Sequence, residues 1–422
     1  MTKNKNIIGI IGLGYVGLPL ALEFSKKNKV IGFDKNKERI IELIKSKDRN
    51  KEVFKNKIRN KKNVKFTSDS ANLKGCNIFI VTVPTPVNNK NLPDLEFLKR
   101  ACEIVAKYIK KNSIFILEST VYPGCTEEFC IPILERISKL KYNKDFYCGY
   151  SPERINPSDK KYTLRNIVKI TSGSNKQTAT KVKNLYKTIC NKTYGVKNIR
   201  TAEAAKVIEN IQRDLNIALV NELSIIFNKI NLKTQDVLKA ASTKWNFVKY
   251  NPGLVGGHCI GVDPYYLTYL SKKYKYNPKV ILAGRKLNNS MPNIITTKFI
   301  SLLKNKKIRE KKSTVLVMGI TYKENVSDLR NSKALDVISS LIERKIKLDI
   351  FEPIVEKKFI YIKNKKILLH KRLPSNKKYD GLLILTQHNV IKKLKKSNLK
   401  KILKKNHVMF SSKAFLENNN NF

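Results

Sequence analysis

The sequence predicts an α/β protein with two Rossmann-like parallel-sheet domains, joined by a long central helix and a helical dimerisation region. A buried strand near the N-terminus runs into a glycine-rich turn that opens a helix, and a second strand–helix series begins at Thr314. Between them, Thr201 to Ile230 contains no glycine or proline and has the composition of one long helix. We therefore expect three parts, with boundaries at 1–198, 199–308 and 309–422.

The first strand and turn are typical of a dinucleotide site. Asn6 to Ile11 is a short apolar run, and residues 12–17 have the G-x-G-x-x-G spacing. The first glycine permits the tight turn, the second lets a pyrophosphate approach, and the third packs helix on strand. The next strand, Val30 to Phe33, ends at Asp34, whose carboxylate is suited to accept hydrogen bonds from ribose hydroxyls. Asp34 favours NAD over NADP, although Arg39 lies one helical turn further on.

Two further strands end in loops rich in proline and hydroxyl groups. Asn77 to Val83 leads into residues 84–86, Pro-Thr-Pro, and Ser113 to Leu117 leads into residues 118–124. Ligands bind at this edge of a parallel sheet, but such hydroxyls are also common as simple caps. Glu153 follows in a turn, where a glutamate is either a solvated surface group or a functional one.

The long helix carries a polar stripe. Lys206, Asn210, Arg213 and Ile217 recur at intervals of three or four residues and share one face. This pattern fits either a helix that lines a ligand cleft or an exposed stripe. A further helical stretch is expected to carry Trp245, and 280–305 is expected to be helical apart from Pro292.

One cysteine stands in an unusual setting, between residues 251 and 267. Cys259 follows Gly256 and Gly257 and precedes Gly261, and Asp263 lies four residues after it. Glycines let backbone pass close to a ligand, and a cysteine thiolate is a strong nucleophile. The alternative is a buried structural cysteine in a glycine-rich turn.

The C-terminal part repeats the strand–helix order without the three-glycine turn. Strands are expected at 314–320, 347–351 and 381–386, and a helix at 331–344. The lysine-rich tail from Lys392 yields no predicted element. This part is expected to bind something other than a dinucleotide.

Composition narrows the class of protein. The 422 residues include 85 Lys and Arg against 33 Asp and Glu, a formal net charge of +52. Nucleic-acid binding would account for this charge, but the lysines are spread along the whole chain and indicate solvated faces instead. The seven cysteines and four histidines have no metal-ligand spacing. We expect a cytoplasmic protein with no metal, no membrane span and no nucleic-acid partner.

Several motifs together resemble the UDP-glucose/GDP-mannose dehydrogenase family. They are Gly-Leu-Gly-Tyr-Val-Gly-Leu-Pro (12–19), Tyr-Ser-Pro-Glu-Arg-Ile-Asn-Pro (150–157), Ala-Lys-Val-Ile-Glu-Asn (205–210) and Gly-Gly-His-Cys-Ile-Gly-Val-Asp-Pro-Tyr-Tyr (256–266). The resemblance runs from Gly12 to about His388. Within the family it is greatest to the UDP-N-acetylglucosamine and UDP-N-acetylgalactosamine 6-dehydrogenases, in particular the Vi-polysaccharide type.

The resemblance implies NAD as cofactor, a UDP-sugar as substrate, a homodimer, and a role in making precursors of surface polysaccharide. It assigns NAD binding to the first part, the catalytic cysteine loop to the second and UDP-sugar binding to the third. The implied catalytic residues are Cys259, Lys206, Asn210, Glu153 and Asp263. The implied cofactor-binding residues are Gly12, Gly14, Tyr15, Val16, Gly17, Asp34, Arg39, Pro84, Thr85, Ser119, Thr120 and Arg330. The implied substrate-binding residues are Glu153, Arg154, Ile155, Lys206, Asn210, Tyr250, Asn251, Gly253, Gly256, Tyr322 and Lys323.

The implied reaction oxidises the C6 alcohol of UDP-N-acetylglucosamine to the acid with two NAD. UDP-N-acetylgalactosamine, UDP-N-acetylmannosamine and UDP-glucose are the alternative substrates, and a simpler hydroxyacid dehydrogenase is an alternative that does not need Cys259. Trp245 and its neighbours are suited either to contact an acetamido group or to pack a dimer core. The chain departs from the family at Ser158, where relatives have glycine, at Val326-Ser327, where they have Cys-Pro, and at Glu352, where they have aspartate.

Overall fold

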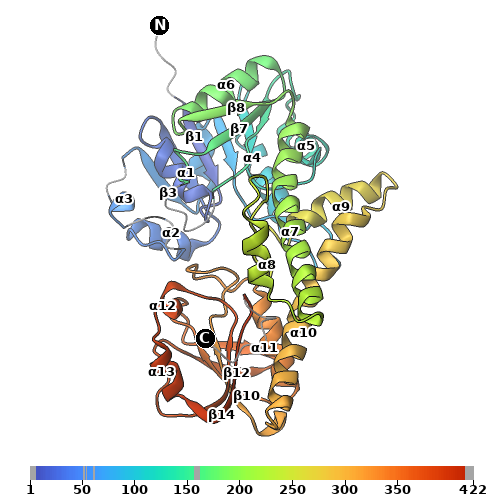
Figure 1. The fold of residues 1–422 in the computed structure, drawn as a ribbon. Helices are drawn as coiled ribbons and strands as arrows, with labels where there is room; N and C mark the ends of the chain where they lie inside the picture. The colour runs from blue at the N-terminus through green and yellow to red at the C-terminus, as the bar shows by residue number, and fades with distance from the viewer. Residues whose placement is uncertain (1–5, 51–52, 54, 60–61, 156–161, 414–422) are drawn as a thin grey trace. The chain divides into compact units, whose positions relative to one another are not determined.

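The structure is a computed structural model, and it describes residues 6–50, 53, 55–59, 62–155 and 162–413. The chain divides into two compact units (Figure 1). The first unit is Met1–Glu209 with Tyr265–Asn277, and the second is Asn210–Pro264 with Pro278–Phe422. Each unit is built on its own sheet with helices, which confirms the α/β class with two sheets. The three-part division stays a prediction.

The first unit contains an eight-stranded sheet. In sheet order its members are β3 (Val64–Thr67), β2 (Lys29–Phe33), β1 (Ile7–Ile11), β4 (Ile78–Val81), β5 (Ile114–Leu117), β6 (Tyr147–Tyr150), β7 (Val168–Gly173) and β8 (Lys192–Gly195). Neighbouring strands are parallel except β6 and β7, which are antiparallel. The order reverses direction between β1 and β4, and this switch point is where a parallel sheet opens a crevice for a ligand.

Helices fill the connections of this sheet. They are α1 (Gly17–Phe24), α2 (Lys37–Ile44), α3 (Lys55–Arg59), η1 (Ser70–Gly75), α4 (Glu96–Ala106), η2 (Thr126–Cys130), α5 (Ile131–Ser138) and α6 (Lys176–Lys187). The strands at β6, β7 and β8 were not predicted, because glycine, serine and threonine interrupt their apolar runs. They extend the sheet beyond the elements expected from the nucleotide motif.

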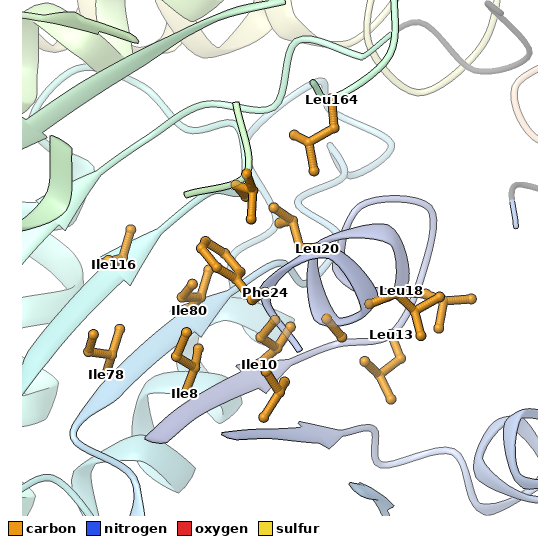
Figure 2. Packing of buried hydrophobic residues seen from close by; sticks show 14 of the residues in the cluster. Ile8, Ile10, Leu13, Leu18, Leu20, Phe24, Ile78, Ile80, Ile116 and Leu164 are labelled. Atoms are coloured by element: carbon orange, nitrogen blue, oxygen red, sulfur yellow. The ribbon is translucent and has the colours of Figure 1, made fainter. Parts of the chain in front are cut away.

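Part of the core of the first unit lies between the sheet and α1. Figure 2 shows Ile8 and Ile10 of β1 on the same face of the sheet as Ile78 and Ile80 of β4, with Phe24 of α1 above them. Side chains two residues apart in a strand point to one face, so these alternating isoleucines form a continuous apolar surface. The packing of α1 on that surface fixes the glycine-rich turn at the carboxyl end of β1.

A long helix, α7 (Ile199–Lys229), passes from the first unit into the second, as the composition of this stretch predicted. Three more helices follow: α8 (Thr234–Ala241), α9 (Asp263–Lys273) and α10 (Lys279–Asn305). The expectation that a helix carries Trp245 is wrong, since α8 ends at Ala241. Pro292, expected to interrupt a helix, lies inside α10.

The second unit contains a six-stranded sheet. In sheet order its members are β11 (Phe359–Ile362), β12 (Lys365–His370), β10 (Lys347–Phe351), β9 (Thr314–Met318), β13 (Tyr379–Ile384) and β14 (Leu403–Ser411). Its helices, besides α8 and α10, are η3 (Glu310–Lys312), α11 (Lys333–Glu343), α12 (Asn389–Lys392) and α13 (Lys396–Lys401). Neighbouring strands are parallel except β11 and β12.

The tail after Lys392, for which we predicted no element, forms α13 and the edge strand β14. Val408 and Phe410 of β14 are buried in the core of the second unit, and the ring of Phe410 lies 6.2 Å from that of Phe299 on α10. The sequence of this strand shows no clear apolar alternation, because residues 404–406, Lys-Lys-Asn, are exposed in succession. No helix of the described residues has an apolar stretch long enough to cross a membrane.

We expect Phe410→Ala to lower the free energy of unfolding of the second unit by about 3–5 kcal/mol, since it removes a buried aromatic ring and leaves a cavity. Denaturant unfolding of the full chain measures the change. The matched control is Lys405→Ala on the same strand, whose exposed side chain should change stability by no more than about 0.5 kcal/mol. Equal effects of both substitutions would contradict the position of β14 in this core.

Candidate active site

The glycine-rich turn has the geometry that a dinucleotide requires. Gly12 has φ +95°, and a Cβ on Gly17 would lie 1.8 Å from the Gly12 carbonyl oxygen, so both positions demand glycine. A Cβ on Gly14 would meet nothing within 4 Å, so this side of the turn is open. Tyr15 and Val16 complete the turn before α1 begins. The free space at Gly14 and the start of a helix beside it fit a pyrophosphate.

Asp34 lies beside this turn. Its Oδ2 accepts a hydrogen bond from the Leu13 N–H (2.8 Å) and its Oδ1 accepts one from the Asn36 N–H (2.9 Å). Arg39 is buried and hydrogen-bonded to two neighbours. Its Nε donates to the Leu13 carbonyl (2.9 Å), and its NH2 group donates to Asp48 Oδ1 (2.8 Å). The carboxylate is thus held where an adenosine ribose would lie, and the residues present fit NAD.

The two hydroxyl-bearing loops at the carboxyl ends of β4 and β5 are hydrogen-bonded to each other. Thr85 Oγ1 donates to the Thr120 carbonyl (2.7 Å), and Ser119 Oγ donates to the Val83 carbonyl (2.6 Å). Pro84 is exposed beside Thr85. The structure therefore brings these predicted cofactor-binding residues together at one edge of the sheet.

Glu203, at the start of α7, fixes the end of the second loop and was not predicted. Its carboxylate accepts hydrogen bonds from the Gly124 N–H (2.6 Å), the Thr126 N–H (2.9 Å) and Thr126 Oγ1 (2.6 Å). Burial raises the pKa of Glu203 to about 7, against the effect of these hydrogen bonds. A lone glutamate on a helix has no sequence signal for such a role.

Glu153 and its two neighbours follow β6. Glu153 Oε1 accepts a hydrogen bond from the Ile155 N–H, and its Oε2 is buried. Arg154 donates to the Val168 carbonyl (2.7 Å) and pairs with Glu209 of α7 (2.8 Å). Residues 156–161, which include the last two positions of the 150–157 motif and Ser158, lie outside the described part of the chain.

A fully buried ion pair lies next to Glu153 and was also missed. Lys169 Nζ of β7 donates to Glu118 Oε2 at the end of β5 (2.6 Å), and Tyr186 of α6 donates to the other oxygen of Glu118. Lys169 Nζ is 4.0 Å from Glu153 Oε2. Burial raises the pKa of Glu118 to about 7, an effect that Lys169 reduces without cancelling it. A lysine inside a strand is exposed in most sequences, which is why no pattern pointed to it.

Lys206 and Asn210 lie one turn apart on α7, and both are nearly buried, at 8% and 7% exposed. This burial excludes the alternative of a solvated stripe at these two positions. Asn210 Nδ2 donates to Asp263 Oδ2 (2.5 Å), so two of the predicted catalytic side chains contact each other directly.

The thiol of Cys259 is exposed, which excludes the alternative of a buried structural cysteine. The Cys259 carbonyl accepts hydrogen bonds from the N–H groups of Val262 (3.0 Å) and Asp263 (2.8 Å), so the residue ends its loop where α9 begins. Gly257 has φ +88°, and a Cβ there would lie 2.6 Å from the ring of Tyr322. A Cβ on Gly256 would lie 2.4 Å from the Asn331 carbonyl. These two glycines let the cysteine loop pack against the loop that carries Tyr322 and Lys323.

A buried polar network supports the preceding segment, which holds Tyr250, Asn251 and Gly253. Asn221 of α7 bonds both backbone groups of Gly253, accepting from its N–H (2.8 Å) and donating to its carbonyl (3.1 Å). Asn221 also donates to Asn288 of α10 (2.9 Å). Asn288 and Arg285 both donate to Asp214 Oδ1 of α7, each at 2.7 Å. The predicted substrate loop is therefore attached to two helices through amide groups.

Two charged groups flank the Tyr322 loop. Asp328 accepts from Arg330 NH2 (2.8 Å) and lies 3.0 Å from His258 Nε2; these bonds hold its pKa well below its usual value even though burial opposes them. Glu352 accepts from the Ile320 N–H (2.8 Å) and is 3.2 Å from His388 Nε2.

His388 Nδ1 accepts from the Asn325 N–H (2.9 Å), which leaves Nε2 as the donor to Glu352. Glu352, whose side chain is longer than the aspartate that the family has at this position, thus has His388 as a buried partner. Burial alone would raise the pKa of Glu352, but the interaction with His388 and the hydrogen bonds from the Ile320 and Ile354 N–H groups together outweigh it and lower the pKa.

The predicted residues therefore gather within each unit. The first unit holds the glycine turn, Asp34, the two hydroxyl loops, Glu153 and Lys206, and the second holds Asn210, Cys259, Asp263 and the Tyr322 loop. Arg330, expected to contact NAD, belongs to the second unit and is paired with Asp328, so its role stays a prediction. Within the described residues no group of three or more His, Cys, Asp or Glu is arranged to hold a metal.

We expect NAD to bind about tenfold or more tightly than NADP, since the 2′-phosphate of NADP would face Asp34 while Arg39 is already engaged. Calorimetric titration of both cofactors measures this ratio. Asp34→Ala should reduce the preference, and Glu38→Ala, at an exposed acid of α2, should leave it unchanged. Equal affinities in the unmodified protein would contradict this assignment.

Comparison with known proteins extends over nearly the whole chain. Three domains of the UDP-glucose/GDP-mannose dehydrogenase family match: the NAD binding domain at residues 6–190, the central domain at 200–290 and the UDP binding domain at 316–418. The chain is 48% identical to the UDP-N-acetyl-D-glucosamine 6-dehydrogenase of Salmonella typhi, covering 97% of this chain and 96% of that protein. It is 46% identical to the enzyme of the same name from Pseudomonas aeruginosa, covering 97% of each.

Solved structures agree with this result. The UDP-D-ManNAc dehydrogenase of Pyrococcus horikoshii superimposes with a TM-score of 0.87 at 27% identity, covering 96% of this chain and 94% of that one. The UDP-N-acetyl-mannosamine dehydrogenase of Staphylococcus aureus superimposes with a TM-score of 0.83 at 30% identity, covering 97% and 94%. The chain therefore belongs to the UDP-glucose/GDP-mannose dehydrogenase family and is an NAD-dependent nucleotide-sugar dehydrogenase.

Proposed function

We propose that this enzyme oxidises the C6 alcohol of UDP-N-acetylglucosamine to the carboxylic acid through a covalent intermediate on Cys259. The observation that carries the proposal is the exposed Cys259, which follows the two glycines packed against the Tyr322 loop and accepts a backbone hydrogen bond from Asp263, the partner of Asn210. The two UDP-N-acetyl-D-glucosamine 6-dehydrogenases with 46–48% identity support the choice of substrate.

The side chains present are suited to a four-electron oxidation. Bound NAD supplies a hydride acceptor, and two NAD are reduced for each acid formed. The C6 alcohol first loses a hydride and a proton to become an aldehyde. The Cys259 sulfur adds to the aldehyde carbon, and the thiohemiacetal loses a second hydride and proton to become a thioester. Water then adds to the thioester carbon, and the C–S bond breaks to restore the thiol.

Each polar residue has a part in these steps. Lys206 and Asn210 are suited to stabilise negative charge on the oxygen at C6, because a buried donor interacts strongly with an oxyanion. Asp263 holds the amide of Asn210 in position. Glu153 accepts the proton of the attacking water in the last step. Tyr322, Lys323 and the segment with Tyr250, Asn251 and Gly253 bind the UDP-sugar.

We expect Cys259→Ala to form no acid while it still binds NAD and the UDP-sugar, since neither ligand depends on the thiol for its main contacts. In the unmodified enzyme two NADH should form per molecule of acid. Absorbance of NADH together with mass spectrometry of the sugar product measures both quantities. A Cys259→Ala variant that still makes acid, or a ratio near one in the unmodified enzyme, would overturn the covalent route.

The protein is proposed to act as a homodimer in the cytoplasm, making precursors of surface polysaccharide. Ile208, Leu219 and Ile226 of α7 are large, apolar and about half exposed, and their spacing of 11 and 7 residues places them on one face of the helix. A second copy packed on α7 would cover them. Six of the seven cysteines are buried thiols, which fits a reducing compartment.

Trp245 has two candidate roles. It is 92% exposed in the single chain, and it precedes the segment proposed to bind the sugar. A bulky aromatic exposed to this degree is suited either to contact the acetamido methyl group or to pack against the second copy.

We expect kcat/KM for UDP-N-acetylglucosamine to exceed that for UDP-glucose about 5- to 150-fold. In a site built to bind the acetamido group, the groups that pair with its amide would lose their hydrogen bonds when UDP-glucose presents a hydroxyl instead. Trp245→Ala should reduce this preference and leave the oligomer intact, whereas Tyr274→Ala, at another exposed aromatic, should change neither. Light scattering of the same variants reports the oligomer. A dissociated Trp245→Ala variant with an unchanged preference would assign the side chain to the dimer, and UDP-glucose as the better substrate would refute the acetamido assignment.

A further inference from the structure

The buried ion pair of the first unit lies directly behind the loop that carries Glu153. Lys169 and Glu118 are both completely buried, and Lys169 Nζ is 2.6 Å from Glu118 Oε2. The same ammonium donates to the Pro152 carbonyl (2.9 Å), the residue just before Glu153. Burying a charged pair costs free energy unless its geometry is well satisfied, so a lysine here needs a reason beyond packing.

Glu153 supplies that reason. Its Oε1 accepts from the Ile155 N–H, but its buried Oε2 has no hydrogen-bond partner among the described residues. This Oε2 lies 4.0 Å from Lys169 Nζ. An ammonium has three N–H donors, and Lys169 directs two of them to Glu118 and the Pro152 carbonyl. The third is available to Glu153 after a small shift or through one water molecule.

The ammonium of Lys169 therefore lies close to two carboxylates, that of Glu118 at the end of β5 and that of Glu153 after β6. The other titratable groups that face this cluster are Tyr186, which donates to Glu118, and Cys190, which follows α6. Arg154 is adjacent in sequence but pairs with Glu209. Burial raises the pKa of Glu118 to about 7; the charge of Lys169 acts to lower it, and repulsion from the nearby Glu153 acts to raise it.

We propose that Lys169 is a positioning residue for Glu153, holding its carboxylate in place through the charge of the ammonium, and that Glu118 limits this effect by competing for the same ammonium. The proposal rests on the role given to Glu153 above, in the hydrolysis of the Cys259 thioester. There, water transfers one proton to Glu153 as its oxygen bonds to the thioester carbon. The C–S bond breaks, and the leaving sulfur takes up the proton that Glu153 received, which restores both the thiol and the carboxylate. Only an ionised Glu153 can accept the first proton.

The test uses two variants that both carry Glu118→Gln and differ only in whether the Lys169 ammonium is present. Glu118→Gln removes the competing carboxylate, so the Lys169 ammonium interacts with the carboxylate of Glu153 alone. Hydrolysis should then persist to lower pH than in the unmodified enzyme. Glu118→Gln/Lys169→Met removes both charges together, which avoids stranding one buried charge, and hydrolysis should fail at higher pH than in the unmodified enzyme. We expect each displacement of the pH at half-maximal rate to be about one unit or more, the size expected of a charge 4–6 Å away.

The measurement is the rate at which the covalent thioester on Cys259 decays, followed by rapid quenching and intact-protein mass spectrometry between about pH 4 and pH 9, a range that begins near the ordinary pKa of a glutamate. Displacements in opposite directions support the proposal, because a purely structural role would impair both variants in the same way. Coincident profiles of the two variants would overturn it. Tyr186→Phe, which alters the same cluster without changing its charge, is the matched control and should move the profile least.

Glu153→Gln separates this proposal from the function on which it rests. If Glu153 serves hydrolysis, this variant accumulates thioester. A Glu153→Gln variant that turns over without accumulation would refute the role of Glu153 itself. Accumulation in Glu153→Gln together with coincident profiles in the Glu118 variants would refute only the part assigned to Lys169.

Discussion

Close approach of one backbone segment to another is the constraint on which both ligand-binding regions depend. In the first unit, Gly17 lies so near the Gly12 carbonyl that any side chain would overlap it. In the second unit, Gly256 and Gly257 stand in the same relation to Asn331 and Tyr322. Each set of glycines brings a strand-end loop against a helix start or a facing loop, and that contact places the polar side chains proposed to bind ligands. The same requirement is therefore met twice with different partners.

Buried polar networks then hold the loops that the glycines bring together. Asn221 fixes the backbone of Gly253 from α7, and Asp214 and Arg285 extend that network to α10. In the first unit, Glu203 holds the loop that follows β5. Each network joins a loop to a helix through fully buried groups, whose hydrogen bonds are costly to break. The loops thus gain a fixed shape without regular secondary structure of their own.

Residues with a spacing rule could be predicted from the sequence, and residues without one could not. The glycine turn, Asp34 and the long helix α7 follow from periodicity and known turn geometry, and the structure has them where expected. Lys169, Glu118 and Glu203 were missed, because their roles depend on contacts with residues 17 to 79 positions away in the chain. Strand β14 was missed because lysines occupy its exposed positions. The exposure of Cys259 also needed the structure, since a glycine-rich sequence is compatible with either a surface or a buried turn.

The distribution of thiols has a consequence for the fate of the enzyme under oxidative stress. All seven cysteines lie in described residues, and Cys259 alone among them is exposed. Burial raises the pKa of Cys76 and of Cys190 to about 12, which keeps those thiols protonated and unreactive. Among the thiols, a peroxide or an alkylating compound therefore reaches that of Cys259 alone, and a sulfenic acid formed there is reversible by a cellular thiol. Loss and recovery of activity would then follow the redox state of one atom, while the fold around the six protected thiols stays intact.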